Sequence, residues 1–188
     1  IATALYRDAY AALQAHQIHE LRSHVDEYEQ AGLAFAQRLG FTIARHFFRS
    51  TLDLGVFDET PFLASLHTAQ AHGIAFATLA ALGDTPDMRR RVYELNKVTA
   101  GDIPGRGPFY TFEEYEQQRF GHAGYRAEGM FLALKGAEWV GLSQVSLHEQ
   151  LAFNEMTGVL RQYRGQQIAQ ALKLLAIRYA KAQWFMGN

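Results

Sequence analysis

The sequence contains no cysteine among its 188 residues. Disulfide bonds and thiolate metal sites are therefore excluded, and a reducing cytoplasm, the location we expect, is allowed. Neither sign of charge is in excess, because 18 basic side chains stand against 19 acidic ones. This balance argues against nucleic acid or an anionic membrane as a partner. No apolar run approaches the roughly 20 residues of a membrane span, and no signal peptide is visible.

A starting methionine is also missing, since the chain begins at Ile1. No capping residue precedes the helical pattern that opens there, and residues 184–188 read as the beginning of a strand. In this interpretation both ends lie inside structured elements, and we expect the chain to be a piece of a longer protein. With 48% hydrophobic residues, it can form one large domain or parts of two.

The N-terminal part of the chain carries alternating helix and strand patterns. Apolar residues at helical spacing predict a helix over 2–16, and a second predicted helix over 28–39 is ended by Gly40. A short strand is predicted over 20–26. One long strand or two short ones are predicted over 41–54, where β-branched and aromatic residues are frequent.

A regular order of elements begins after a connector at 55–73, which holds a short helix after Pro61. The order is strand, helix, loop, helix, three strands and a helix. The predicted ranges are 74–82, 86–100, 101–108, 112–120, 130–134, 138–147, 151–160 and 166–183. Thr85 is the predicted N-cap of the first of these helices, and Thr111 with Glu114 is a predicted capping box for the second.

Two of these elements show a clear apolar side. Period two places Trp139, Val145 and Leu147 on one face of their strand. The last helix has an inward stripe at spacings of four, three and four, formed by Ile168, Leu172, Leu175 and Tyr179.

The segment 162–167 leads directly from a strand into a helix. Gly165 can adopt a positive φ and lets a ligand approach the main chain. The first turn of the helix offers unpaired N–H groups and a partial positive charge, which together bind phosphate oxygens well. Arg161 and Arg164 add positive charge. The segment lacks the Gly-Lys-Ser/Thr ending of a Walker loop and the three-glycine dinucleotide fingerprint. We therefore predict a diphosphate-binding loop of another kind.

The same segment resembles the acetyl-CoA pyrophosphate motif of the GNAT N-acetyltransferases, which runs from a strand through Gln/Arg-x-x-Gly-x-Gly/Ala into a helix. The flanking Thr157-Gly158-Val159 and Ile168-Ala169-x-Ala171-Leu172-Lys173 also resemble that family. The order of elements over 74–188 is similar to that of a GNAT domain. The resemblance implies an α/β (α+β) fold, with a mixed, mostly antiparallel central sheet flanked by helices.

A tandem pseudo-repeat of this fold is our interpretation of the whole chain. GLAFAQRLGF, at 32–41, resembles a late helix of the family, and residues 1–5 align with 168–172. Residues 1–54 would be the C-terminal half of a first domain, 55–73 a connector, and 74–188 a second domain lacking its C-terminal part. Ala36 stands where many members carry a tyrosine that protonates the leaving thiolate of CoA, so the first copy is expected to be degenerate.

The resemblance implies acetyl-CoA as the acetyl donor and direct attack on its thioester by a primary amine of a small molecule or a peptide. Glu155 on the preceding strand is the candidate general base, with a solvated strand carboxylate as the alternative. Gln167 departs from the motif, and its side chain would either crowd the diphosphate or donate a hydrogen bond to it. The implied cofactor-binding residues are Val159, Leu160, Arg161, Gln162, Arg164, Gly165, Gln166, Gln167, Ile168 and Ala169.

Other functions stay open at this point. A non-catalytic CoA-binding or scaffold protein of the same fold is favoured by Ala36 and Gln167. A nucleotide-phosphate binder is disfavoured by the missing Walker lysine. No metal site is expected, because His19 and His24 would point about 140° apart on a helix. The loop at 101–110 is either an acceptor-binding loop or a plain connector, and an unfinished sheet allows a homodimer.

Overall fold

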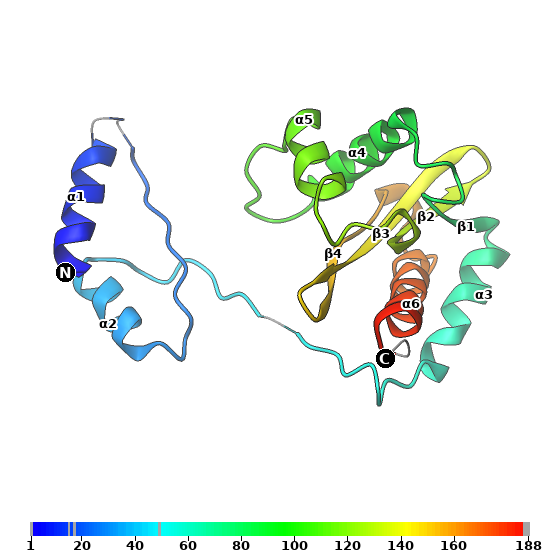
Figure 1. The fold of residues 1–188 in the computed structure, drawn as a ribbon, viewed down its shortest axis with the longest axis horizontal. Helices are drawn as coiled ribbons and strands as arrows, with labels where there is room; N and C mark the ends of the chain where they lie inside the picture. Colours follow the sequence, from blue (N-terminus) through cyan, green and yellow to red (C-terminus); the bar gives the residue numbers. More distant parts are fainter. Residues whose placement is uncertain (1, 15, 17, 49, 186–188) are drawn as a thin grey trace. The chain divides into compact units, whose positions relative to one another are not determined.

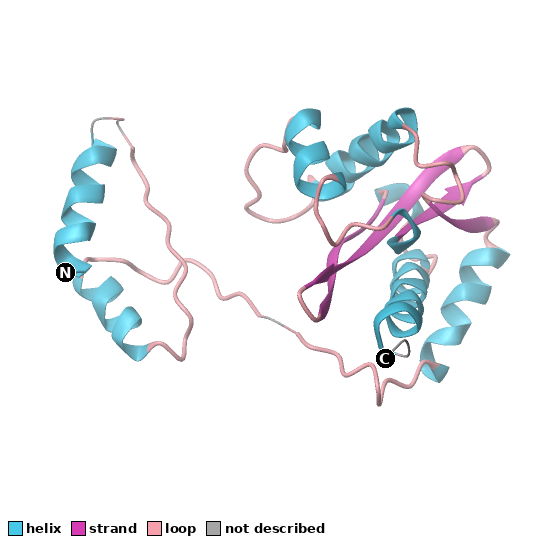
Figure 2. Cartoon of the chain, viewed as in Figure 1, coloured by secondary structure: helices cyan, strands magenta, loops and turns pink. Residues whose placement is uncertain are grey.

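The computed structural model describes residues 2–14, 16, 18–48 and 50–185. The chain divides into two compact units, Ile1–Ser50 and Thr51–Asn188. Figure 1 follows the chain from one end to the other, and Figure 2 distinguishes its helices from its strands.

The first unit contains two helices, α1 (Ala2–Gln14) and α2 (Gln30–Arg38), and neither has a buried residue among those described. Tyr6 of α1 packs edge-on against Phe35 of α2, with ring centroids 6.4 Å apart. Gly40 follows α2 with a φ of +86°, as expected of a residue that ends a helix. The two predicted helices of this part of the chain are confirmed.

The strands predicted over 20–26 and 41–54 are wrong, because the described residues of both segments are irregular. β-Branched and aromatic side chains favour a strand where a neighbouring strand supplies hydrogen bonds and packing. No described residue of the first unit is buried, and Phe47 and Phe48 are largely exposed. The residues of these two segments favour a strand, but among the described residues they pair with no neighbouring strand.

The second unit is built on a four-stranded antiparallel sheet with the order β1-β2-β3-β4. The strands are β1 (Ile74–Thr78), β2 (Met130–Lys135), β3 (Glu138–His148) and β4 (Leu151–Val159). Each pairs with its neighbour in the sequence, so β1 and β4 are the edges of the described sheet. This antiparallel sheet with helices on both faces confirms the predicted fold class. The tandem repeat stays a prediction.

Helices cover the two faces of the sheet in pairs (Figure 1). α3 and α6 pack on one face, where Ile168 lies in a core with Phe131. α4 and α5 pack on the other, where Tyr115 lies in a second core with Leu132. The helical segments are η1 (Thr60–Phe62), α3 (Leu63–Ala71), α4 (Pro86–Ala100), α5 (Phe112–Tyr115), η2 (Glu116–Phe120), η3 (Ala127–Gly129), η4 (Arg161–Tyr163), α6 (Ile168–Ala180) and η5 (Lys181–Phe185).

Local sequence sets the starts of α4 and α5. Thr85 Oγ1 accepts a hydrogen bond from Met88 N at 3.3 Å. Thr111 Oγ1 accepts from Glu114 N at 3.2 Å, and the Glu114 carboxylate accepts in return from Thr111 N at 2.8 Å. Both predicted caps are confirmed. The helix predicted over 112–120 changes character on the way, because α5 passes directly into the π-helix η2.

A β-bulge on β3 changes which core its side chains enter. Trp139 and Gly141 pair with consecutive residues of β2, so Val140 is an extra residue. Trp139 packs in the core beneath α4 and α5, whereas Val145 packs in the core on the other face. The prediction that Trp139 and Val145 share a face is therefore wrong, because the extra residue reverses the alternation.

Candidate functional site

The loop after β4 turns into α6 through two residues with positive φ. Gly165 has a φ of +82°, and a Cβ placed on it would meet no atom within 4 Å. The space over this turn is therefore open. Gln167, the N-cap of α6, has a φ of +62° and makes no side-chain capping bond. A non-glycine residue rarely adopts this conformation, so the loop holds Gln167 in a strained backbone.

The backbone amides of 165–170 donate to no acceptor among the described residues, since the first bond into α6 runs from Ala171 N to Gln167 O, at 3.0 Å. Unpaired amides at the positive end of a helix dipole form an anion-binding environment. Leu160 differs, because its N–H donates to Val140 O at 2.9 Å and is used by the sheet. Amides alternate across a strand, so the Val159 N–H points to the open edge of β4.

A cavity of about 620 Å³ lies beside this loop. Its walls come from the end of α4 and the segment after it, from β4, and from the start of α6. Gly158 lets α4 lie directly on β4, because a Cβ on it would be 2.5 Å from Thr99 Oγ1. The volume is typical of small-molecule sites. Of the predicted cofactor-binding residues, the cavity is lined by Val159, Arg164, Gly165, Gln167, Ile168 and Ala169, and not by Leu160, Arg161, Gln162 or Gln166.

Asp102, which the sequence did not single out, holds both arginines of the loop. It follows α4 and lines the same cavity. Its Oδ1 accepts from Arg161 Nε at 2.8 Å and from Arg161 Nη2, and its Oδ2 accepts from Arg164 Nη2. Arg164 Nε donates to Val159 O at 3.1 Å. The hydrogen bonds from Arg161 and Arg164 lower the pKa of Asp102 to about 2.

Glu155 lies on a second bulge, this one on β4. Asn154 and Met156 pair with consecutive residues of β3, which leaves Glu155 as the extra residue. The Met156 side chain packs in the core beneath α4 and α5, and Glu155 meets Arg119 of η2 on the same side of the sheet. Beside Glu155 and Arg119 lies a second, separate cavity with a volume of about 50 Å³. It is lined by Gln118, Arg119, His122, Gln144, Ser146, His148 and Glu155.

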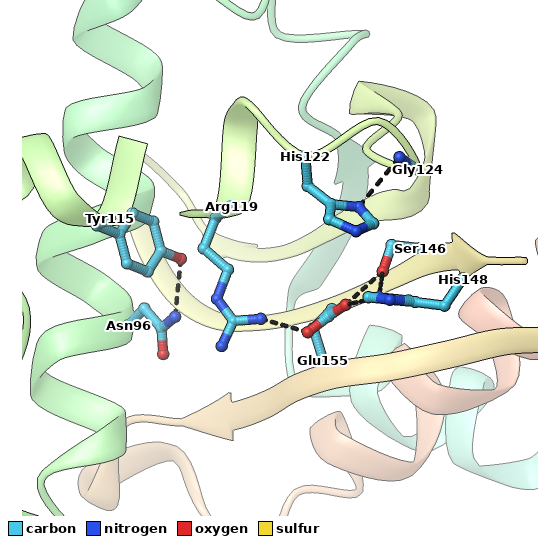
Figure 3. A network of polar contacts seen from close by, with 8 residues as sticks. All are labelled: Asn96, Tyr115, Arg119, His122, Gly124, Ser146, His148 and Glu155. Carbon is cyan, nitrogen blue, oxygen red and sulfur yellow. Dashed lines mark hydrogen bonds and ion pairs between the residues drawn. The ribbon is translucent and has the colours of Figure 1, made fainter. Parts of the chain in front are cut away.

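Figure 3 shows the Glu155 carboxylate surrounded by hydrogen-bond donors. Ser146 Oγ donates to its Oε1 at 2.5 Å, His148 Nε2 approaches the same oxygen at 2.6 Å, and Arg119 Nη1 pairs with Oε2. An ionised carboxylate can only accept, so a hydrogen bond at this position needs the His148 tautomer that carries its proton on Nε2. The Glu155 side chain is 10% exposed. The alternative that it is a solvated strand carboxylate is therefore wrong.

Burial and hydrogen bonding act on Glu155 in opposite directions. Burial raises the pKa of its carboxyl, whereas the hydrogen bonds from Ser146 and His148 and the charge of Arg119 lower it by more, so the pKa is below its usual value. The cluster is not a Ser-His-Glu triad. Ser146 and Glu155 both contact Nε2 of His148, whereas a triad needs the carboxylate on the other ring nitrogen. The geometry suits a carboxylate that stays ionised and fixed in position.

The described residues contain neither a metal-ligand cluster nor a membrane-spanning helix. No group of three or more histidine or acidic side chains in this part of the chain could hold a metal ion. No helix within it is both long enough and apolar enough to cross a membrane.

Comparison with known proteins found similar chains among the solved structures. No family model matches the sequence. No curated protein matches it. A similar solved structure is that of a GCN5-related N-acetyltransferase from Sphaerobacter thermophilus, with 21% sequence identity and a TM-score of 0.42. The match covers 58% of this chain and 33% of that chain, so this chain spans about a third of the length of that protein. A likeness at this level establishes neither a family nor an activity.

Proposed function

We propose that residues 74–188 bind acetyl-CoA beside the loop 162–167 and transfer its acetyl group to a primary amine of a small molecule or a peptide. The observation that carries this proposal is the cavity of about 620 Å³ in which the open turn at Gly165, Arg164 and the unpaired first turn of α6 meet. The polar end suits a diphosphate. Apolar wall residues suit a thin aliphatic chain, namely Ile103, Pro104, Met156, Val159 and Ile168.

Acetyl-CoA, when bound, would supply an activated acetyl group as a thioester. The Val159 N–H at the edge of β4 and the amides of 165–170 would bind and orient it. Arg161 and Arg164 would neutralise the diphosphate, while Gln162, Gln166 and Gln167 stay predicted contacts. Leu160 would contribute its side chain, because its amide is used in the sheet.

Glu155 would take up the proton that the amine loses when its nitrogen bonds to the acetyl carbon. Its lowered pKa means that it is ionised at neutral pH and ready to accept a proton, although it is a weaker base for the same reason. Ser146 and His148 would hold the carboxylate in place. The acceptor would approach from the side of η2, where the smaller cavity lies.

A non-catalytic CoA-binding protein of the same fold is the second candidate. It is favoured by the fact that the charged groups of both cavities are already paired within the chain. Asp102 occupies both loop arginines, and three donors occupy Glu155. In that case the cavity would bind CoA, and no amine would be acetylated.

Thermal unfolding with acetyl-CoA, CoA and ATP–magnesium tests the binding site. A ligand at about 100 times its dissociation constant stabilises the folded state by roughly 2.7 kcal/mol, which raises the melting temperature clearly. We expect a shift with acetyl-CoA and CoA and none with ATP–magnesium. A shift with ATP alone would assign the cavity to nucleotides, and no shift with any ligand would remove the proposal.

The variant Gly165→Val tests whether acetyl-CoA binds over the turn at Gly165. The side chain would fill the open space over the turn, and we expect it to abolish the shift with acetyl-CoA. The matched control is Gly136→Val in the β2–β3 turn, because Gly136 has a φ of +60° and also has no neighbour within 4 Å of a Cβ. Both variants carry the same kind of backbone strain. Wild-type affinity in Gly165→Val would show that the diphosphate binds elsewhere.

A further inference from the structure

We propose that Asp102 is an internal competitor for the two loop arginines, and that it weakens the binding of phosphate-bearing ligands at the cavity. This inference rests on the proposed function, because it assumes that CoA binds beside the loop. Asp102 would act through Arg161 and Arg164, and we therefore regard it as a residue that sets the affinity of the cavity and has no part in the chemistry.

The geometry places Asp102 where an anion of the ligand would otherwise bind. Both of its carboxylate oxygens are occupied, one by Arg161 and the other by Arg164. Arg164 is held a second time, through its Nε on Val159 O. This second bond leaves the guanidinium next to the cavity when Nη2 exchanges Asp102 for another acceptor. A phosphate that takes the Nη2 donor of either arginine must therefore displace the carboxylate.

The exposure of the three side chains permits that exchange. Arg161 is 78% exposed and Arg164 is 48% exposed, whereas Asp102 is 22% exposed. Both arginines can turn toward a ligand without losing their own hydration, because water reaches their guanidinium groups throughout. Asp102 would remain at the cavity wall beside Ile103 and Pro104. Its negative charge would then oppose the incoming anion.

A lower affinity for anions follows from this competition. Any phosphate group that takes the Nη2 donors from Asp102 loses the free energy of the ion pair that it breaks. A diphosphate offers more oxygens to both arginines and to the free amides of the loop, so it has more contacts with which to offset that loss.

Isothermal titration with CoA, followed by competition with inorganic pyrophosphate and orthophosphate, tests the inference on the full chain. We expect Asp102→Asn to tighten CoA binding about fivefold, which is the scale of a partly exposed ion pair. Orthophosphate and pyrophosphate should also bind more tightly. Glu138→Gln is the matched control. Glu138 accepts from Tyr163 Oη at 2.6 Å and is bonded to neither arginine, and its substitution should leave these affinities unchanged.

A double-mutant cycle separates competition from a structural role. In an Arg161→Ala, Arg164→Ala background, Asp102→Asn should tighten CoA binding less than it does in the wild type, because only the repulsion between Asp102 and the anion is then removed. An undiminished effect would overturn the inference, as would equal or weaker CoA binding by Asp102→Asn alone, and in both cases the proposed function would stand. If CoA binds neither the wild-type chain nor Asp102→Asn, the proposed function fails and the inference fails with it.

Discussion

Two arginine–carboxylate clusters lie along β4, and they differ in how far water reaches them. Around Glu155, the carboxylate side chain is 10% exposed and Arg119 is 25% exposed. Around Asp102, the two arginines are much more exposed than the carboxylate they share. The Glu155 cluster lies at the bulge within β4, and the arginines of the Asp102 cluster come just after the end of the strand.

The difference separates a fixed group from an exchangeable one. A carboxylate that has lost most of its water needs its donors, because an unpaired buried charge is costly. An exposed ion pair contributes little and can be replaced by water or by a ligand. The buried cluster thus suits a role in positioning and proton transfer, and the exposed cluster suits reversible binding of an anion.

The largest expected effect concerns the role assigned to the buried carboxylate. Glu155→Gln keeps the shape and one acceptor but removes the charge and the site for a proton. If Glu155 is the general base, acetyl transfer should fall by about 10²- to 10⁴-fold, while acetyl-CoA affinity stays the same. Steady-state kinetics with an amine screen, together with calorimetry, measures both. Glu149→Gln, in the turn of the same hairpin, should keep the wild-type rate. An unchanged rate in Glu155→Gln would leave the cluster with a structural role.

The second prediction compares stability directly. Arg119→Ala removes one donor from a nearly buried carboxylate, and we expect the free energy of unfolding to fall by about 2 kcal/mol. Arg161→Ala removes a donor from the exposed cluster and should leave the urea midpoint unchanged. Urea unfolding of both variants measures the difference. Equal losses would mean that burial does not distinguish the clusters.

Local chemistry was readable in the sequence. Thr85, and Thr111 with Glu114, were predicted as caps because a capping bond joins residues three apart. The loop 162–167 was predicted because a strand, a glycine and a helix start follow one another there. The inward stripe of α6 was also predicted, and its first two members, Ile168 and Leu172, are fully buried.

Contacts between distant segments were not readable. Asp102 lies 59 residues from Arg161, and no pattern in a single sequence connects them. The bulges at Val140 and Glu155 depend on how two strands pair, so period two failed at Trp139. The segment 41–54 was predicted as strand on propensity alone, without any partner strand in view. In each case the missing information was tertiary.

The third prediction uses pH. The folded pKa of Glu155 is lowered, so its contribution to stability is present above the unfolded pKa of roughly 4.3 and is lost as the pH falls through the folded value. The difference in urea midpoint between wild type and Glu155→Gln should therefore be constant from neutral pH to about pH 5 and shrink below it.

Salt completes this comparison. In 1 M NaCl the screening length is about 3 Å, so only exposed charges are strongly screened. The difference in urea midpoint between wild type and Glu155→Gln should therefore persist in about 1 M NaCl at neutral pH. Any difference for Asp102→Asn, whose pKa is about 2 in the folded state, should disappear under the same conditions. A Glu155 difference that grows as the pH falls would contradict the direction of its pKa shift.

The smallest expected effect is at Arg164, where charge and geometry can be separated. Arg164→Lys keeps a positive charge beside the cavity but cannot donate to Val159 O and to Asp102 at once in the same planar arrangement. We expect CoA to bind about threefold more weakly, with an unchanged melting temperature, because the pair is exposed. Calorimetry measures the affinity, and Lys173→Arg, farther along α6, serves as the control for a simple exchange of cations. The Nε and Nη2 donors of Arg164 could both be needed to hold its guanidinium at the cavity while a phosphate replaces Asp102. In that case Arg164→Lys should also lose part of its preference for pyrophosphate over orthophosphate. An unchanged preference would mean that charge alone selects the ligand, and the exposed cluster would then be a diffuse positive surface.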